Sequence, residues 1–345
     1  MTRFRLLPTA WRGLSHLALW AAVLLSPVMA YGATRYPLTV RSCDRDIVIE
    51  AAPRRAVAHD VNMIEMMLAL GLAPRMAGYT GIGDSKQRPA GLGKLPELSR
   101  QYPSLETLLA ARTDFFFAGW NYGMHVGGPV TPESLARFHI PVYVLSESCA
   151  HVMPTGPARF EDVYRDLHAL GDIFDVASAA QQRVAAMRSM LATVTRALAA
   201  EPSRPSVFVY DSGTDKPFTA GALAMPSAII AAAGGRNVLD DVPRSWTRVG
   251  WETLRSRDPD IILIVDYGSV SAADKIAFLS SMSGLRELRA IRERRFVILP
   301  YAALTPGIHN AEAALALAHA LHPQATRALP HPFAQRAAPD APRQR

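Results

Sequence analysis

Apolar residues form their longest regular pattern between Val176 and Glu201, where they predict one continuous helix. They recur four, three, four, three and four positions apart, which aligns one helical face: Ala180, Val184, Met187, Leu191, Val194 and Leu198. Asp175 is placed to cap the first turn, and Pro202 is placed to end the helix. At 1.5 Å per residue the helix would be roughly 35–40 Å long, about the diameter of a domain.

Short apolar runs alternate with helix-like stretches on both sides of this pattern, after a predicted hairpin over 38–49. The expected strands are 55–59, 75–79, 114–118 and 142–145 before the long helix, and 207–210, 261–265 and 296–299 after it. The expected helices are 62–70, 104–111, 131–138 and 159–174, then 226–233, 251–256, 275–280 and 312–321. Strands that alternate with helices form parallel sheets covered on both faces. We therefore predict an α/β fold of two Rossmann-like lobes joined by one long, rigid helix.

These patterns also predict the limits of each part of the chain. The N-terminal lobe should span 36–174, the connecting helix 175–202 and the C-terminal lobe 203–323. Proline, alanine and arginine dominate from 324 to 345, so a disordered tail is expected there.

A short segment occurs once in each predicted lobe. SLETL around Glu106 and GWETL around Glu252 each precede a buried strand, and in both copies an aspartate follows the glutamate by eight positions. The copies are 146 residues apart, far more than the period of a solenoid repeat. This spacing predicts two lobes related by duplication.

The first thirty residues are typical of a secretory signal peptide. A basic start leads into an apolar run over 14–25, and Val28-Met29-Ala30 supplies small or aliphatic residues for cleavage after Ala30, with Ala33 as a poorer alternative. The run is short for a bilayer span, which disfavours the alternative of a retained membrane anchor. No cysteine stands at the cleavage site, so a lipid anchor is not indicated. We expect an exported protein.

Positive charge is concentrated at the two ends of the chain. Of the net charge of +7, the first dozen residues and the residues after Pro323 each carry +3, which leaves +1 for the body. A nearly neutral body has no general attraction for nucleic acid, so no nucleic-acid partner is expected.

Cys43 and Cys149 are the chain's two cysteines, and an even pair in an exported protein is a disulfide candidate. Closing a loop of about a hundred residues would constrain the unfolded chain by roughly 4–5 kcal/mol. Two buried free thiols remain the alternative. Neither cysteine lies in a C-x-x-C motif, so a zinc or redox site is not expected.

Four longer motifs together resemble those of the substrate-binding proteins of ABC importers. They are RRAVAHDVNMIEMMLALGL, YPSLETLLAARTDFFFAGW, FEDVYRDLHALGDIF and VGWETLRSRDPDIILIVDYG, and the resemblance extends from Tyr36 to about Pro323. In particular the chain resembles the family that captures ferric siderophores, cobalamin and haem, in which one rigid helix joins the lobes. Members with the same SESC and VxxC cysteines look like a subgroup.

The resemblance implies what the protein binds and where it acts. It implies a monomeric periplasmic protein that delivers its ligand to an ABC permease dimer, with closure of only a few degrees. The ligand would be a ferric siderophore, a corrinoid or haem, and no covalently bound cofactor is expected.

Candidate ligand-binding residues follow the predicted strands, because ligands of open α/β sheets lie beyond the carboxyl ends of the strands. Those of the first lobe are His59, Asp60, Asn62, Tyr79, Trp120, Asn121, Tyr122 and Glu147. Those of the second lobe are Asp211, Phe218, Trp246, Arg248, Tyr267, Tyr301 and Thr305. Aromatic rings can stack on a planar ligand, and Arg248 can meet an anionic one. Such residues also pack within lobes, so we expect about half of them to contact ligand.

Glu106 and Glu252 lie near predicted helix starts, where the helix dipole favours a carboxylate. The resemblance implies a further role for them, since the matching glutamates of the family dock onto arginines of the two permease subunits.

Two alternatives have less support. A metal-ion binding protein of the same architecture would need convergent ligands, but His59, His125, His151 and His309 show no ligand spacing, and His309 is expected to cap the last helix. Haem iron could be held by His59 or a tyrosine. A secreted hydrolytic enzyme is disfavoured, because the chain has no G-x-S-x-G or phosphate-binding loop motif. No catalytic or resident metal site is therefore predicted.

Overall fold

The long apolar pattern forms helix α5, Ala177–Ala197, in a computed structural model that describes Met1, residues 33–83 and residues 88–333. Its buried residues all belong to the predicted stripe: Ala180, Val184, Met187 and Val194. The predicted signal peptide over 1–30, with its cleavage site at Ala30, lies outside the described residues apart from Met1.

Both ends of α5 differ from the prediction. Val176 occupies the N-cap position without a side-chain hydrogen bond, so the capping role predicted for Asp175 is wrong. Asp175 has a positive φ of 58° in the turn before α5, and its Oδ1 accepts a hydrogen bond of 2.6 Å from the Thr34 backbone N–H. The helix ends at Ala197, before Pro202, and is therefore about 32 Å long.

The first lobe is built on a parallel sheet with strand order β5-β4-β3-β6, in which β6 also pairs with β7 and β8. Its strands are β3 Ala56–His59, β4 Met76–Thr80, β5 Glu97–Ser99, β6 Phe115–Trp120, β7 Gly123–Met124 and β8 Val142–Val144. The antiparallel hairpin of β1, Leu38–Ser42, and β2, Arg45–Ile49, precedes them. The helices are α1 Val61–Ala69, η1 Ala73–Arg75, α2 Leu105–Ala110, α3 Pro132–Ala136, η2 Ser146–His151 and α4 Phe160–Ile173.

The second lobe has a parallel sheet of its own, with strand order β11-β9-β13-β14. Its strands are β9 Ser206–Tyr210, β11 Arg236–Asn237, β13 Ile261–Asp266 and β14 Phe296–Pro300, and β10 Phe218–Ala220 pairs antiparallel with β12 Trp246–Arg248. The helices are α6 Met225–Ala232, α7 Trp251–Arg257, α8 Ala272–Ser281, η3 Ser283–Leu285, α9 Arg289–Arg292, α10 Tyr301–Leu304, α11 Asn310–Leu321 and α12 Pro323–Thr326.

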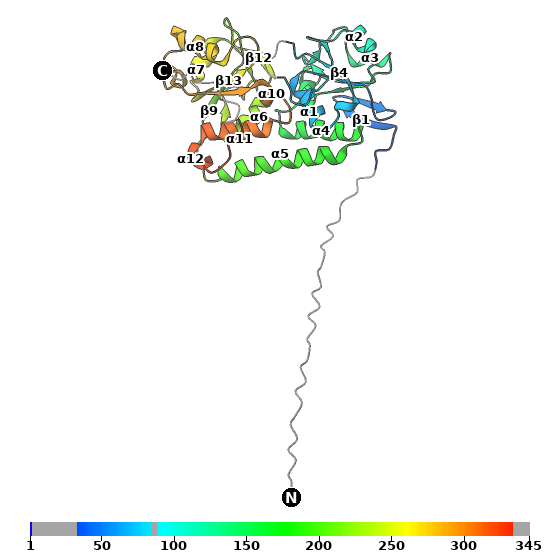
Figure 1. Cartoon of the computed structure of the whole chain (residues 1–345). Helices are drawn as coiled ribbons and strands as arrows, with labels where there is room; N and C mark the ends of the chain where they lie inside the picture. The colour runs from blue at the N-terminus through cyan, green and yellow to red at the C-terminus, as the bar shows by residue number, and fades with distance from the viewer. Residues whose placement is uncertain (2–32, 84–87, 334–345) are drawn as a thin grey trace, which may run out of the picture. The chain divides into compact units, whose positions relative to one another are not determined.

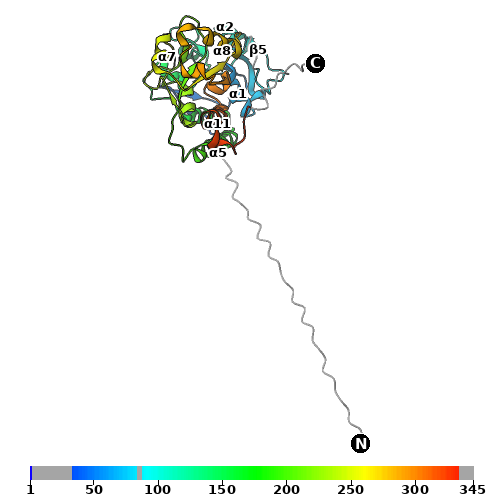
Figure 2. The same ribbon diagram turned by 90° about the vertical axis from the view of Figure 1, so that its left-hand side faces the viewer.

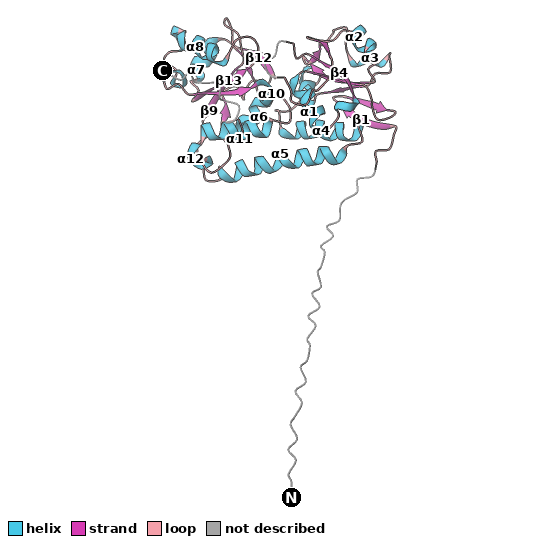
Figure 3. Cartoon of the chain, viewed as in Figure 1, coloured by secondary structure: helices cyan, strands magenta, loops and turns pink. Residues whose placement is uncertain are grey.

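Helices cover both faces of these sheets (Figure 3), which explains why the central strands are apolar on every side. All residues of β6 are buried: Phe115 and Phe117 pack in the core on one face, and Phe116 packs in a separate cluster on the other. Burying one such side chain contributes about 1.5–3 kcal/mol. The strands therefore anchor the loops that follow their carboxyl ends.

Helix α5 packs against α4 of the first lobe and α11 of the second, and it runs beneath both (Figure 1). The lobes also meet directly where α1 contacts α10. Figure 2 shows α5 and α11 on the side of the lobes opposite α2 and α7. The predicted fold class, two α/β lobes with parallel sheets and one long connecting helix, is confirmed.

The predicted tail is wrong in its first part. Helix α12 reaches Thr326, and Leu329 and Phe333 pack against the core. His331 stacks on His319 of α11 with ring centroids 3.7 Å apart. These few large side chains anchor a segment whose composition otherwise indicates disorder; residues 334–345 lie outside the described part. Among the described residues, no helix is long and apolar enough to cross a membrane.

Candidate ligand-binding site

Three rings in contact lie at or after strand ends of the first lobe. His59 ends β3 and is buried, and its Nδ1 lies 2.8 Å from Thr80 Oγ1 at the end of β4. Tyr102 meets the His59 ring edge-on at a centroid distance of 4.9 Å and stacks on His125 at 4.5 Å. Burial, with His125 nearby, lowers the pKa of His59 to about 3, so this imidazole is neutral.

Asp60 links the two lobes directly. Its backbone has a positive φ of 66°, and its Oδ1 accepts a hydrogen bond of 2.6 Å from the Val61 N–H. Its Oδ2 accepts a bond of 2.7 Å from the Tyr301 hydroxyl of the second lobe. Burial raises the pKa of Asp60 to about 6, although both hydrogen bonds act in the opposite direction.

Aromatic residues of both lobes surround this carboxyl group. Tyr267 stacks on Tyr301 at 4.3 Å and is 44% exposed. Burial raises the pKa of Tyr102 to about 12, and Asp60 and Tyr267 are close enough to add to the effect. Burial and the negative charges of Glu147 and Asp60 raise the pKa of Tyr122 well above its usual value. We refer to Asp60, Tyr102, Tyr122, Trp246, Tyr267 and Tyr301 as the junction cluster.

Trp246 joins the cluster from the second lobe, where β12 pairs with β10. Its indole lies beside the Tyr122 hydroxyl of the first lobe, but its Nε1 has no hydrogen-bond partner within the described chain. Phe218 stacks on Trp246 at 5.8 Å, and the Arg248 guanidinium lies 5.3 Å from the Phe218 ring centre. The exposed Arg248 guanidinium is suited to an anionic group on a ligand, whereas the Trp246 N–H is buried.

Several predicted residues have their polar atoms engaged inside the protein. Asn62 is fully buried; its Nδ2 donates to the Pro306 carbonyl across the lobes at 2.7 Å, while its Oδ1 has no hydrogen-bond partner within the described chain. Thr305 is also fully buried and donates to the Tyr301 carbonyl at 3.1 Å. Tyr79 accepts a hydrogen bond from Arg88, and Trp120 lies in a core cluster. Their proposed ligand contacts stay a prediction.

Glu147 and Asp211 are likewise engaged in hydrogen bonds. Glu147 accepts from the Met225 N–H at 2.6 Å and from the Ser245 hydroxyl at 3.1 Å, both in the second lobe. Burial raises its pKa to about 8, against the effect of these bonds. Asp211 accepts a bond of 2.7 Å from the Ser212 hydroxyl, and burial raises its pKa.

Asn121, His125 and His151 form an exposed polar group beside the rings. Asn121 has a positive φ of 65°, and its Oδ1 and Nδ2 lie 3.3 Å from His125 Nδ1 and His151 Nε2 respectively. Tyr102 was not among the residues predicted from the sequence, and His125 was considered there only as a metal ligand. Tyr102 follows β5, whose three residues carry no recognisable strand pattern. Because this strand was not predicted, the residues after it were not considered as ligand contacts.

Within the described residues, no group of three or more His, Cys, Asp or Glu is arranged to hold a metal ion. His309 occupies the N-cap position of α11, as predicted, although its side chain makes no capping hydrogen bond. Its Nδ1 lies 2.8 Å from Glu312 Oε2, and its Nε2 lies 3.5 Å from Glu65 Oε2 in the first lobe. Burial alone would lower its pKa, but these two carboxylates raise it to about 9.

Glu106 and Glu252 are exposed in the first turns of α2 and α7, on the side of each lobe away from α5 (Figures 1 and 2). A hydrogen bond from Ser104 lowers the pKa of Glu106. The Glu252 carboxylate lies over the backbone of its N-cap residue, where a Cβ on Gly250 would come within 1.8 Å of Oε1. Both glutamates therefore present carboxylates at helix starts.

Cys43 and Cys149 form a disulfide with a Cα–Cα distance of 5.4 Å. The predicted pairing is confirmed, and the alternative of two buried thiols does not apply. The disulfide joins the turn between β1 and β2 to η2.

The chain forms two α/β lobes on one long helix, and aromatic and acidic groups of both lobes lie together where the lobes meet. This arrangement is typical of a protein that holds a ligand between its lobes. The model of the family described as periplasmic binding proteins matches residues 57–303, so the chain belongs to this family.

Individual relatives support the same placement. The chain is 24% identical to the vitamin B12-binding protein of Yersinia pestis (strain Pestoides F) over 228 residues, 66% of this chain and 74% of that protein. A periplasmic binding protein from Veillonella parvula superposes with a TM-score of 0.72 at 27% identity, covering 83% of this chain and 97% of that one. An ABC-type Fe3+-hydroxamate transport system structure from Saccharomonospora viridis has a TM-score of 0.71 at 23% identity, covering 84% and 100%.

Proposed function

We propose that this chain is the solute-binding component of an ABC importer and that it captures a bulky iron–siderophore or cobalamin-like ligand between its lobes. The observation that supports this most is the junction cluster, in which rings from both lobes lie around one carboxyl group. Stacked aromatic faces suit a large, partly planar ligand, and each such contact contributes about 0.5–1.5 kcal/mol.

Charge at the lobe junction narrows the ligand class. Arg248 is exposed beside Phe218, so an anionic group is favoured on the second-lobe side. A relative described as a vitamin B12-binding protein and a solved structure described as an ABC-type Fe3+-hydroxamate transport system are consistent with this class. Haem and a free metal ion are second candidates, since His59 is buried and its Nδ1 is already engaged by Thr80.

The cellular setting is part of the proposal. We infer an exported, monomeric, periplasmic protein whose signal peptide is cleaved near Ala30, and which delivers its ligand to a permease dimer. A binding role without catalysis fits the family. Helix α5, packed against both lobes, would keep the difference between free and bound lobe angles small.

Ligand titration of the mature protein tests the proposal. Tryptophan fluorescence would be recorded with cyanocobalamin, a ferric hydroxamate and haemin, because Trp246 lies within the junction cluster. We expect saturable quenching by one of these, a loss of most of the quenching in Trp246→Phe, and weaker binding in Tyr267→Ala. Trp11 precedes the predicted cleavage site and Trp20 lies in the apolar run, so neither would contribute.

The matched control is Trp251→Phe, which removes an indole that packs on Tyr210 and Phe278 within the second lobe. It should leave the affinity unchanged. Binding that is indifferent to Trp246 and Tyr267, or turnover of the titrated compound, would contradict the proposed function.

A further inference from the structure

The SESC motif, Ser146 to Cys149, is attached to the first lobe by its serines and its cysteine. The Ser146 hydroxyl donates to Asp166 Oδ1 of α4 at 2.6 Å, and its backbone N–H donates to the same carboxyl group at 3.2 Å. The Ser148 hydroxyl donates to the Leu145 carbonyl at 2.7 Å and accepts from the Trp120 N–H at 3.0 Å. The motif is therefore held to α4, to β6 and, through its disulfide, to the hairpin.

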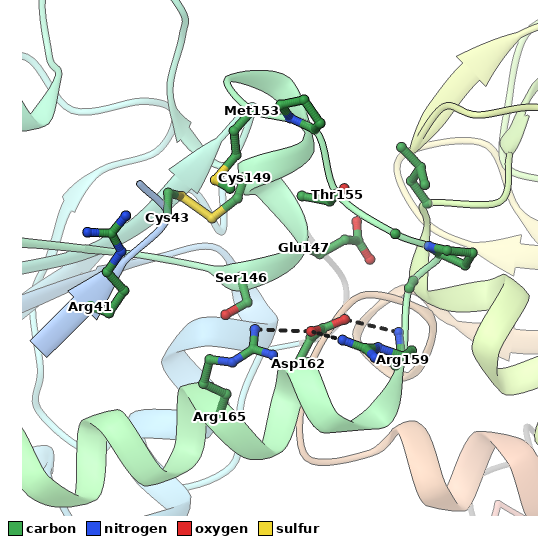
Figure 4. A pocket seen from close by; sticks show the side chains of 15 residues that line it. Arg41, Cys43, Ser146, Glu147, Cys149, Met153, Thr155, Arg159, Asp162 and Arg165 are labelled. Carbon is green, nitrogen blue, oxygen red and sulfur yellow. Dashed lines mark hydrogen bonds and ion pairs between the residues drawn. A yellow bond between two sulfur atoms is a disulfide. The ribbon is translucent and has the colours of Figure 1, made fainter. Parts of the chain in front are cut away.

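Glu147 is the member of the motif that faces the other lobe. Figure 4 shows its side chain and the Cys43–Cys149 disulfide leaving the same turn of chain in opposite directions. Its Oε2 accepts from the Met225 N–H and its Oε1 from the Ser245 hydroxyl. Both oxygens are thus engaged by the second lobe.

Helix α6 lacks a cap of its own at this point. Its N-cap residue is Ala224, which has no side-chain acceptor, and its second residue is Pro226, which has no N–H. The Met225 N–H is the first donor of the helix, and a carboxyl oxygen there is also favoured by the helix dipole. Glu147 supplies from one lobe the cap that the other lobe's sequence does not contain.

A cavity of about 350 Å³ lies beside this contact, between η2, the start of α4 and Leu223 of the second lobe. Arg159 and Arg165 line it and pair with Asp162 (Figure 4). The cavity shows that the lobes do not pack tightly here. They are connected on this side by the Glu147 contacts and by one backbone bond, from the Ala158 N–H to the Ala222 carbonyl at 3.2 Å.

We infer that Ser146–Cys149 is an interlobe brace, in which the disulfide and the serines fix Glu147 so that it caps α6 and sets the angle between the lobes. The Glu147 Oε2 can accept the Met225 hydrogen bond whether the carboxyl group is charged or neutral, because it has a lone pair in both states. The cap therefore does not require an ionised carboxylate. The inference concerns the lobes themselves and is independent of the ligand proposed above.

Hydrogen–deuterium exchange of the full mature protein tests the brace. In Glu147→Ala, exchange at the start of α6 (peptide 223–232) should become about tenfold faster. The reason is that the Met225 N–H loses its buried hydrogen bond to the Glu147 carboxyl group. Glu147→Gln retains a carbonyl acceptor and should restore most of the protection. Cys43→Ala with Cys149→Ala should also make hydrogen exchange of this peptide faster, although both changes lie in the first lobe.

Ser227→Ala is the matched control, because its hydroxyl donates to the Gly221 carbonyl at 2.7 Å within the second lobe. The cysteine pair combined with Glu147→Ala should add little at α6, because both changes act through the same brace. If the cysteine variant does not fold, Ser245→Ala takes its place with the same expectation. Unchanged exchange at 223–232 in Glu147→Ala, or uniform acceleration throughout both lobes, would overturn the inference.

Discussion

The Tyr301 hydroxyl donates a hydrogen bond of 2.7 Å to Oδ2 of Asp60, although the two residues are 241 positions apart and belong to different lobes. Asp60 directly follows β3, and Tyr301 directly follows β14. The bond therefore connects the carboxyl ends of the two sheets, where the ligand is proposed to lie.

Tyr301→Phe would remove this bond and keep the ring. A buried carboxyl that loses a donor is less well solvated, so we expect a loss of about 1–3 kcal/mol in the free energy of unfolding. We also expect the pKa of Asp60 to rise further above its usual value, because the Tyr301 bond holds it down. Urea denaturation measures the stability. Tyr267→Phe is the control, since it changes the stacked partner ring in the same way, and an equal loss there would contradict the assignment.

Periodicity predicted the scaffold because it depends on local spacing. The α5 stripe and the apolar run of β6 reflect burial of one helical face or of both strand faces, which any sequence must encode locally. The short strands β5, β7, β10, β11 and β12 were not predicted, because they have two or three residues and none of them is a continuous β-branched or aromatic run like that of β8. Boundaries set by single contacts, such as the Thr34–Asp175 bond, were missed for a similar reason.

The candidate site was predicted only as a set of positions. Selecting residues that follow predicted strands found Asp60 and Tyr301. The sequence does not show, however, whether such a side chain points toward a ligand or packs inside the protein. Asp60, Asn62 and Glu147 were all selected in this way, and all three are buried and hydrogen-bonded to the other lobe. Which of these occurs depends on how the lobes pack together, and no local pattern encodes that packing.

Gly81 is a position where the site geometry requires glycine. It has a φ of +84°, and a Cβ there would lie 2.3 Å from Cε1 of the His59 ring. Gly81→Ala should displace this ring from Thr80 and destabilise the fold by roughly 2–4 kcal/mol, since overpacking adds to the backbone strain. Thermal unfolding and the chemical shifts of the His59 ring report the two effects.

Gly91→Ala provides the matched control for Gly81→Ala. Gly91 has a similar φ of +90°, but a Cβ there would meet nothing within 4 Å. It should therefore show the backbone cost alone, about 1–2 kcal/mol. Equal destabilisation in the two variants would indicate that contact with His59 is unimportant.

His309 should make the stability depend on pH. Its pKa is raised to about 9 in the folded protein by Glu312 and Glu65, so the folded state holds this proton more tightly than the unfolded chain. The contribution is fully present below pH 6.5 and is lost as the pH rises through 9. It amounts to about 3 kcal/mol at most.

The measurement compares the wild type with His309→Gln by urea denaturation between pH 6 and pH 10. The difference in unfolding free energy should be largest at pH 6 and should nearly vanish at pH 10. Glu65→Gln should reduce this pH dependence, because it removes the carboxylate of the first lobe. A difference that stays constant across the range would show that the pKa of His309 is not raised in the folded protein.

Glu106 and Glu252 are predicted to act in transport and not in ligand capture. Both are exposed at the starts of α2 and α7, on the side of the lobes opposite α5. A matched pair of carboxylates, one on each lobe, fits a permease made of two subunits. Glu106→Ala with Glu252→Ala should leave ligand affinity unchanged and abolish ligand-dependent uptake in cells that contain the permease.

Each single variant should retain part of the uptake, because one charged contact remains. Glu133→Ala with Glu293→Ala is the matched control: Glu133 lies on α3 of the first lobe and Glu293 caps α9 of the second, so it also removes one carboxylate per lobe. This control should transport normally. If the double variant of Glu106 and Glu252 transports as well as the control, these helix starts do not contact the permease; if its ligand affinity falls instead, they form part of the binding site.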